Sequence, residues 1–97
     1  MIVNRWVFTL TGPHEEEAFA MIKAEMIRVH PGRRMRFYKG NIAPLGGCAW
    51  EAEYENLAEF DKARDARYAA MSPDFLKKLG EMGAWVGGGT NEIWNLE

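Results

Sequence analysis

The sequence has little cysteine, little histidine and no excess of charge of one sign. Its 97 residues contain one cysteine, Cys48, which cannot form an intramolecular disulfide, whereas secreted chains of this size usually carry several. Its 12 Lys and Arg against 14 Asp and Glu give a net charge of −2, and this balance provides no basic surplus to attract phosphate backbones. We therefore expect a cytoplasmic protein that does not bind nucleic acid.

Long apolar runs are also lacking. A helix needs about 20 consecutive apolar residues to cross the hydrocarbon core of a membrane, and the apolar runs here are only a few residues long. The first ten residues carry Asn4 and Arg5 inside their apolar stretch, which is not typical of a signal peptide. The sequence therefore predicts neither a membrane partner nor a targeting segment.

Standard catalytic and metal-binding motifs are missing. The sequence has no HExxH, no GxSxG and no P-loop, and its glycine run at residues 87–89 is not followed by Lys-Ser or Lys-Thr. The two histidines, His14 and His30, and the single Cys48 do not have the spacing of metal ligands. We therefore expect no metal and no cofactor.

The overall composition, 47% hydrophobic and 27% charged, is typical of a globular domain. Residues 1–97 are predicted to form one domain. Aromatic and β-branched content and period-two alternation predict strands over residues 2–10, 33–40, 48–55 and 84–97. Pro44 and the Gly46–Gly47 pair predict a hairpin turn between the second and third strands. The three glycines inside the last strand predict a bulge or a turn.

Two stretches between these strands predict helices. The first is expected to be capped by Thr11 or Gly12 and to end at His30, and its apolar stripe is Phe19, Ile22, Met26 and Val29. The second begins with the capping box Asn56 to Glu59, and Leu57, Phe60 and Arg64 then follow one helical face towards Tyr68 and Met71. Ser72 and Pro73 restart it, with an expected buried set of Phe75, Leu76, Leu79 and Met82.

The order of these elements is βαββαβ, which predicts an α+β protein of the ferredoxin-like class. In that topology the four antiparallel strands follow the order 4-1-3-2, and the helices cover one face. Strand parity then places Trp6 and Trp50 under the helices. Glu51 and Glu53 fall on the open face, between Arg5 on one neighbouring strand and two arginines on the other, Arg34 and Arg36.

This open face has two interpretations. It is either a solvated surface with ion pairs between strands, or the surface on which a second copy packs. We favour a homodimer because Val3, Val7 and Ala49 are mixed with the charges, although a heterodimer with a paralogue has the same requirements.

Three segments carry a family resemblance, namely WEAEYENLAEFDKA, MSPDFLKKL and GGGTNEIW. With them the chain resembles the dimeric α+β barrel superfamily, in particular its NIPSNAP-like and antibiotic-biosynthesis-monooxygenase-like branches. The resemblance implies that two sheets pack face to face into a barrel. Its members include cofactor-free oxygenases, haem-degrading enzymes, isomerases and cyclases. The haem-degrading branch has an Asn and a Trp that Asn4 and Trp50 resemble, but it also needs a histidine on the second helix, and residues 56–82 contain none.

A ligand pocket between the sheet and the helices is the candidate site. Asn4 and His30 are its candidate catalytic residues, and the candidate substrate-binding residues are Trp6, Tyr38, Trp50 and Tyr54. Each has a structural alternative: Asn4 and the aromatic residues in the core, and His30 as a helix cap whose imidazolium the helix dipole stabilises. Cys48 is expected to be a small buried residue rather than a nucleophile.

These observations predict a small-molecule protein that binds or acts on an apolar aromatic or polycyclic compound. If it is an enzyme, the resemblance implies cofactor-free oxygenation, cyclisation or isomerisation. The alternative is a non-catalytic binding or accessory dimer whose pocket is filled by its own side chains. An enzyme should have an open cavity into which Asn4 or His30 reaches.

Overall fold

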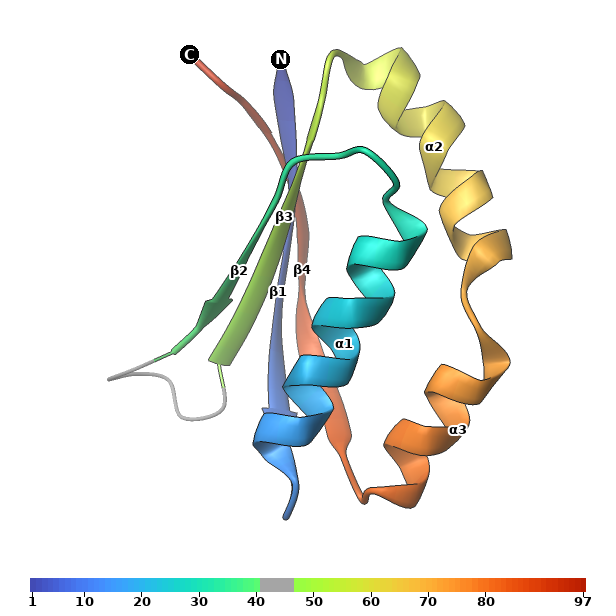
Figure 1. The fold of residues 1–97 in the computed structure, drawn as a ribbon. Coiled ribbons are helices and arrows are strands. Elements are labelled where there is room, and N and C mark those ends of the chain that lie inside the picture. The colour runs from blue at the N-terminus through green and yellow to red at the C-terminus, as the bar shows by residue number, and fades with distance from the viewer. Residues whose placement is uncertain (41–46) are drawn as a thin grey trace.

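The computed structural model describes residues 1–40 and 47–97, and the predicted hairpin loop with Pro44 and Gly46 lies outside them. Within the described residues, four strands and three helices follow one another in the order βαββααβ. The strands are β1 (Ile2–Thr11), β2 (Met35–Lys39), β3 (Gly47–Tyr54) and β4 (Trp85–Asn95), and the helices are α1 (Glu15–Val29), α2 (Leu57–Ala70) and α3 (Pro73–Glu81). Figure 1 shows the helices on one side of the sheet and both termini at the same end.

The strands form one antiparallel sheet in the order β2-β3-β1-β4. This is the predicted order, and it confirms the ferredoxin-like α+β class. In the pairing of β1 with β3, Trp6 lies opposite Trp50 and Arg5 lies opposite Glu51. Because side chains alternate along a strand, the tryptophans share the helix-covered face and the charged pair shares the open face.

The start of α1 differs from the prediction that Thr11 or Gly12 caps the helix. β1 extends through Thr11, and the N-cap is His14, whose side chain makes no capping hydrogen bond. Gly12 has a φ of 136°, and a Cβ atom there would lie 2.7 Å from the carbonyl oxygen of Gly83. Glycine is therefore needed at position 12, where the chain leaves β1 and passes close to the backbone that leads into β4. The buried stripe of α1 is close to the prediction and consists of Ala18, Ile22, Glu25, Met26 and Val29.

The capping box of α2 is confirmed. Asn56 Oδ1 accepts a hydrogen bond of 2.9 Å from the Glu59 amide, and the Glu59 carboxylate accepts one of 3.0 Å from the amide of Glu55, one residue before the cap. Of the predicted face of α2 only Phe60 is buried, and the other buried residue is Arg67, which that face does not include.

Two stripes on α2 share Phe60, and the structure uses the one that the prediction did not choose. Ala63 and Arg67 follow Phe60 at helical spacing and face the sheet, whereas Leu57 is 54% exposed. The small Ala63 allows the helix to approach the sheet, and the guanidinium of Arg67 finds a buried hydrogen-bond partner in His30. Arg67 is therefore packed inside although it is charged.

α3 begins as predicted, with Ser72 at the N-cap and Pro73 in the first turn. Leu79 is buried, and Phe75 and Met82 are partly buried against the core. Leu76, which the pattern assigned to the buried set, is 59% exposed. A helix of nine residues lying at the edge of the layer buries only one narrow stripe.

The predicted bulge in the last strand is confirmed. The register between β1 and β4 shifts between Phe8 and Thr9, opposite the three glycines of β4. Gly89 has a φ of 139°, and a Cβ atom at this position would lie 1.9 Å from the carbonyl oxygen of Val7. Only glycine fits there, and the bulge leaves backbone without side chains along one edge of the helix-covered face.

The open face of the sheet carries the expected charge pairs. Glu53 lies 3.0 Å from the guanidinium of Arg36 and 3.6 Å from that of Arg34. Glu51 accepts a hydrogen bond from the Tyr38 hydroxyl. Trp94, which lies opposite Val3 in the register, is 59% exposed. The face therefore combines paired charges with a large exposed apolar side chain.

Candidate functional site

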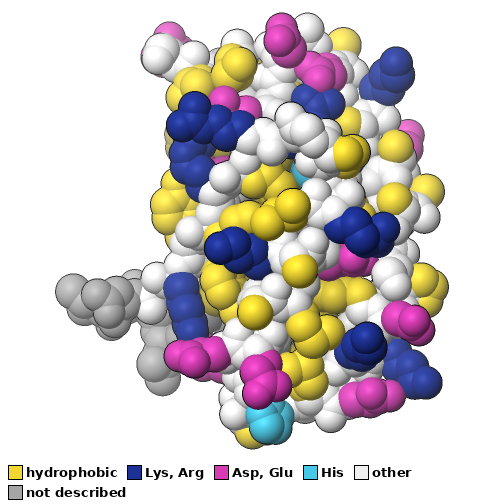
Figure 2. Space-filling model, viewed as in Figure 1, with side chains coloured by type: hydrophobic (Ala, Val, Ile, Leu, Met, Phe, Trp, Pro, Cys, Tyr) yellow, Lys and Arg dark blue, Asp and Glu magenta, His cyan; other side chains and the backbone are white. Residues whose placement is uncertain are grey.

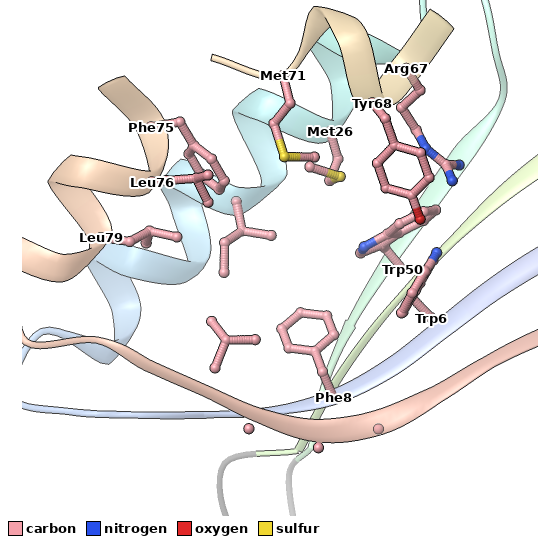
Figure 3. Close-up of a pocket in the computed structure, with 15 residues that line it drawn as sticks. Trp6, Phe8, Met26, Trp50, Arg67, Tyr68, Met71, Phe75, Leu76 and Leu79 are labelled. Atoms are coloured by element: carbon pink, nitrogen blue, oxygen red, sulfur yellow. The ribbon is translucent and has the colours of Figure 1, made fainter. Parts of the chain in front are cut away.

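A pocket of about 490 Å³ lies between the helix-covered face of the sheet and the helices, as Figure 3 shows. Trp6, Phe8 and Trp50 line it from the sheet, and the backbone of Gly87 to Gly89 lines it from β4. The volume falls in the range of small-molecule sites, about 300–1,000 Å³. The glycine bulge contributes to the cavity because no side chain projects from it.

The helices supply the other wall of the pocket. α1 contributes Ile22 and Met26, and α2 contributes Tyr68 together with Arg67. The junction between α2 and α3 contributes Met71, and α3 contributes Phe75, Leu76 and Leu79. Nearly all of these side chains are apolar, and the methionines and leucines can adjust their rotamers to a ligand. The pocket therefore suits a largely apolar molecule.

The two tryptophans at the sheet side of the pocket lie against each other. The ring centroids of Trp6 and Trp50 are 6.1 Å apart, with an angle of 34° between the ring planes. The imidazole of His30 approaches Trp50 edge-on, at 5.1 Å between centroids. Aromatic pairs in such geometries contribute about 0.5–1.5 kcal/mol beyond their buried area. The predicted proximity of Trp6 and Trp50 is therefore observed, and both line the pocket.

His30 lies behind Trp50 and does not line the pocket. It ends α1 as the C-cap, as the structural alternative predicted, and its Nδ1 lies 2.5 Å from the carbonyl oxygen of Met26. This contact assigns the proton to Nδ1, which leaves Nε2 to accept a hydrogen bond of 3.3 Å from Arg67 Nη1. These contacts favour the neutral ring over the imidazolium of the helix-cap interpretation. Burial lowers the pKa of His30, and the positive charges of Arg67 and Arg33 lower it further, against the opposing effect of the Met26 carbonyl.

Arg67 is the charged residue of the pocket wall, and the sequence pattern did not single it out. It is only 4% exposed, and its guanidinium carbon lies 5.8 Å from the ring centroid of Trp50 and 5.1 Å from that of Tyr68. Its Nη2 atom is buried and makes no hydrogen bond within the described residues. The signal in the sequence was its position seven residues after Phe60, on the stripe that packs inward.

Asn4 is fully buried but does not line the pocket. Its Nδ2 atom donates hydrogen bonds to Asn91 Oδ1 at 2.5 Å and to the carbonyl oxygen of Glu92 at 3.1 Å. The amide therefore ties β1 to β4. The position of Asn4 fits the structural alternative, and its predicted catalytic role has no geometric support in this pocket.

Two other predicted site residues also lie away from the pocket. Tyr54 is buried against Phe60, at 5.3 Å between ring centroids, and the guanidinium of Arg33 lies over its ring at 4.3 Å. Tyr38 lies on the open face of the sheet, where its hydrogen bond to Glu51 raises the pKa of the tyrosine. Of the six predicted site residues, the structure therefore brings only Trp6 and Trp50 to the pocket.

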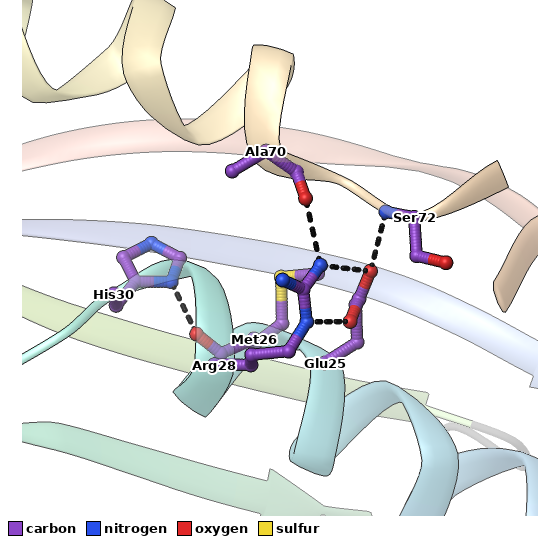
Figure 4. A network of polar contacts seen from close by, with 6 residues as sticks. All are labelled: Glu25, Met26, Arg28, His30, Ala70 and Ser72. Atoms are coloured by element: carbon purple, nitrogen blue, oxygen red, sulfur yellow. Dashed lines mark hydrogen bonds and ion pairs between the residues drawn. The ribbon is translucent and has the colours of Figure 1, made fainter.

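A polar network holds the helical wall of the pocket in place (Figure 4). The buried carboxylate of Glu25 accepts hydrogen bonds from Arg28 at 2.7 Å and from the Ser72 amide at 2.8 Å. Arg28 in turn donates to the carbonyl oxygen of Ala70 at 2.7 Å. The hydrogen bond from Arg28 lowers the pKa of Glu25 more than burial raises it. Glu25 thus ties α1 to the junction between α2 and α3, which carries the pocket residue Met71.

Other kinds of site have less support in the described part of the chain. Residues 1–40 and 47–97 contain no group of three His, Cys, Asp or Glu side chains that could hold a metal ion. Burial raises the pKa of the Cys48 thiol, which disfavours the thiolate. Among the helices of these same residues, none is long and apolar enough to span a membrane. On the face seen in Figure 2, positive and negative side chains are interspersed rather than segregated.

The sequence matches no protein-family model and no curated protein. Solved structures, by contrast, share its architecture over nearly the whole chain. A NIPSNAP family protein of unknown function from Agrobacterium tumefaciens has a TM-score of 0.74 at 17% identity, covering 97% of this chain and 86% of that one. The chain has the NIPSNAP-like fold. The resemblance predicted from the sequence is thereby confirmed at the level of the fold.

The NIPSNAP-like fold is shared, less closely, with oxygenases. SnoaB, a cofactor-independent oxygenase from Streptomyces nogalater, has a TM-score of 0.51 at 20% identity, covering 98% of this chain and 91% of that one. A structure from Deinococcus radiodurans that is described as a proposed antibiotic biosynthesis monooxygenase has a TM-score of 0.54 at 10% identity, covering 100% of this chain and 93% of that one. At these identities the similarity concerns the fold and does not extend to the reaction.

Proposed function

We propose that this protein is a homodimer that binds an apolar aromatic or polycyclic small molecule in the pocket between its sheet and its helices. The observation that carries the proposal is the cavity of about 490 Å³ with Trp6, Phe8 and Trp50 on its sheet side. Flat aromatic surfaces favour flat apolar ligands, and the cavity is large enough for several fused rings. A core filled by its own side chains would leave no such space.

Binding without turnover is the role that the geometry favours. The two predicted catalytic residues, Asn4 and His30, both make hydrogen bonds elsewhere and do not line the pocket. Cofactor-free catalysis would require a polar group at the reacting atoms that orients the substrate and stabilises developing charge. Among the pocket residues, Arg67 is the candidate for this role, so a cofactor-free oxygenase, cyclase or isomerase is the second candidate function.

The homodimer is proposed from the open face of the sheet. Trp94 adds a large exposed apolar side chain to a face that also carries charged residues. The Nε atom of Arg5 on this face is buried without a hydrogen-bond partner in the described residues. Packing of a second copy would cover the exposed indole and bring arginines of one chain near acidic residues of the other. The pocket lies on the opposite face, so each chain of the dimer keeps its own site.

Fluorescence quenching tests the ligand proposal. The neutral aromatic amide 2-naphthamide should quench the tryptophan fluorescence of the protein saturably, at one site per chain. Because four tryptophans share the signal and two of them line the pocket, Trp50→Phe serves to identify the contribution of one pocket tryptophan, and the saturable quenching should be smaller in this variant. Quenching that remains linear in probe concentration would contradict a defined site.

A pair of matched substitutions locates the site by calorimetry. Phe75→Trp adds bulk at the pocket wall and should weaken 2-naphthamide binding at least tenfold. Leu57→Trp adds the same ring at an exposed position of α2 and should leave the affinity within twofold of the wild type. Equal affinities in the two variants would place the binding site elsewhere.

A further inference from the structure

We propose that the ligand carries an oxyanion, either a carboxylate or an ionised phenol or enol, and that Arg67 binds this oxygen at the end of the pocket where α2 crosses the sheet. This inference rests on the proposed function and narrows it, because it specifies which aromatic compounds the pocket prefers.

Among residues 1–40 and 47–97, Arg67 is a buried cation without a counterion. A guanidinium keeps its positive charge in proteins, so burial cannot neutralise it. The ion pairs formed among the described residues involve Arg28, Arg33, Arg34, Arg36 and Arg64, and Arg67 is not one of them. Its polar partner is the neutral ring of His30, which contacts Nη1 at 3.3 Å. A buried charge with no compensating anion is costly, and a ligand anion would compensate it.

The unused donors lie together at one end of the pocket. Arg67 Nη2 and the indole Nε1 of Trp6 are both buried and have no hydrogen-bond partner within residues 1–40 and 47–97. Figure 3 shows the Tyr68 hydroxyl on the same side of the pocket as the Arg67 guanidinium and the Trp6 indole nitrogen. Guanidinium and indole N–H groups can only donate. The group that satisfies them must therefore be an acceptor, and next to a cation an anionic acceptor is preferred.

His30 supports this arrangement from behind the pocket wall. Its Nδ1 contact with Met26 fixes the ring, so that Nε2 accepts from Nη1 of Arg67 and orients the guanidinium. Nη2 is left for the ligand. The remaining pocket wall is aromatic and aliphatic, so the preferred compound has an apolar ring system with one anionic oxygen at its end. Arg67 is here a binding residue and His30 a positioning residue.

The test compares isosteric charged and neutral probes by calorimetry at pH 7.5. Wild-type protein should bind 2-naphthoate at least tenfold more tightly than 2-naphthamide. Arg67→Met should remove this preference by weakening 2-naphthoate at least tenfold while changing 2-naphthamide less than twofold. Arg64→Met, the same substitution at an exposed arginine of α2, should change neither affinity. The phenolate 2,4-dinitro-1-naphtholate provides a third probe, and the tighter of the two anions identifies the source of the oxyanion.

The outcomes separate this inference from the proposed function. Equal wild-type affinities for the naphthoate and the amide, or an unchanged preference in Arg67→Met, would overturn the oxyanion site and leave an apolar pocket. Failure of all three probes to bind would overturn both proposals. If Arg67→Met does not fold, the inference is tested by the preference of the wild-type protein for 2-naphthoate over 2-naphthamide and by the Trp6→Phe variant. That variant removes the indole N–H and keeps an aromatic ring, and it should weaken naphthoate more than naphthamide.

Discussion

At the scale of single residues, His30 shows how burial decides the state of an ionisable group. Its ring is packed among Trp50, the Met26 carbonyl and two arginines, Arg67 from α2 and Arg33 from the segment before β2. Burial is the largest cause of the lowered pKa of His30, the two arginines lower this pKa further, and the hydrogen bond to the Met26 carbonyl opposes these effects. The packing of α2 against His30 therefore favours the neutral ring, because only an unprotonated Nε2 can accept the hydrogen bond from Arg67.

This environment predicts how stability depends on pH. The pKa of His30 in the folded protein lies below its ordinary value of 6.5, so at acidic pH the unfolded chain binds more protons than the folded one. The contribution of His30 should be fully present above pH 6.5 and be lost as the pH falls through the folded pKa. Each pH unit by which the pKa of the folded state lies below that of the unfolded state corresponds to about 1.4 kcal/mol of folding stability. Urea unfolding at pH 7.5 and 5.5 measures this loss, which should be smaller in His30→Gln.

His14 provides the matched control for this prediction, because it is the other histidine of the chain and is exposed. The pH dependence of stability should differ from that of the wild type more in His30→Gln than in His14→Gln. Titration of the two histidine C–H signals by NMR measures the pKa of His30 directly. A value at or above 6.5 would contradict the burial argument.

Predictability from sequence at this scale was uneven. Trp6 and Trp50 were correctly placed together because strand parity depends only on counting residues. Asn4 was correctly placed on the helix-covered face, yet its partners on β4 could be known only from the pairing of distant strands. Arg67 was overlooked because a charged residue on a helix is ordinarily solvated, and its burial depends on the tertiary contact with His30.

At the scale of helices and strands, the Glu25 network connects stability to the pocket. We expect Glu25→Gln to lower the free energy of unfolding by about 1–3 kcal/mol, since it weakens the hydrogen bonds to Arg28 and the Ser72 amide. A change of 1 kcal/mol shifts the melting temperature of a domain of this size by about 4–8 °C. The affinity for 2-naphthamide should also fall, because the junction that carries Met71 loses its tie to α1.

Glu16→Gln is the control for this substitution, because Glu16 is exposed on the first turn of α1. Its loss should cost only the small interaction with the helix dipole and leave ligand affinity unchanged. A Glu25→Gln protein as stable as the Glu16→Gln variant would show that the network does not hold the junction. Thermal melts and calorimetry on the two variants therefore provide the comparison.

The type and order of the elements followed from local rules, whereas their packed faces did not. The Asn56 cap, the Pro73 restart and the glycine bulge each depend on residues a few positions apart, and all three are observed. The start of α1 was misplaced because Gly12 is required by the approach of Gly83, more than 70 positions away in the chain. The inward face of α2 was misjudged because Phe60 is shared by two stripes.

At the scale of the whole molecule, the open face of the sheet predicts self-association. Light scattering at micromolar concentration should give about twice the 11.1 kDa mass of the chain. Arg36→Glu should weaken the dimer, because it places a third negative charge beside Glu51 and Glu53. A mass near that of one chain for the wild-type protein would contradict the proposed homodimer.

Lys77→Glu makes the same charge reversal on α3, at an exposed position on the opposite side of the sheet. The dissociation constant of this control should match that of the wild type. Because Arg36→Glu also breaks an ion pair within the chain, thermal melts of both variants are needed to separate dissociation from unfolding. An unchanged dissociation constant in Arg36→Glu would place the interface elsewhere.

The sequence alone determined the βαββαβ order, the strand order and the division of the sheet into a charged and an aromatic face, because these depend on short-range periodicity and on a small set of allowed topologies. The tertiary structure decided where the cavity lies and what lines it. A cavity exists where helices of particular lengths fail to fill the space above a sheet. Here the size of that space depends on the glycine bulge of β4 and on the hydrogen bond that ties Glu25 of α1 to Ser72, between α2 and α3. The lack of a counterion for Arg67 among the described residues likewise became visible only in three dimensions, because no local pattern in the sequence records it.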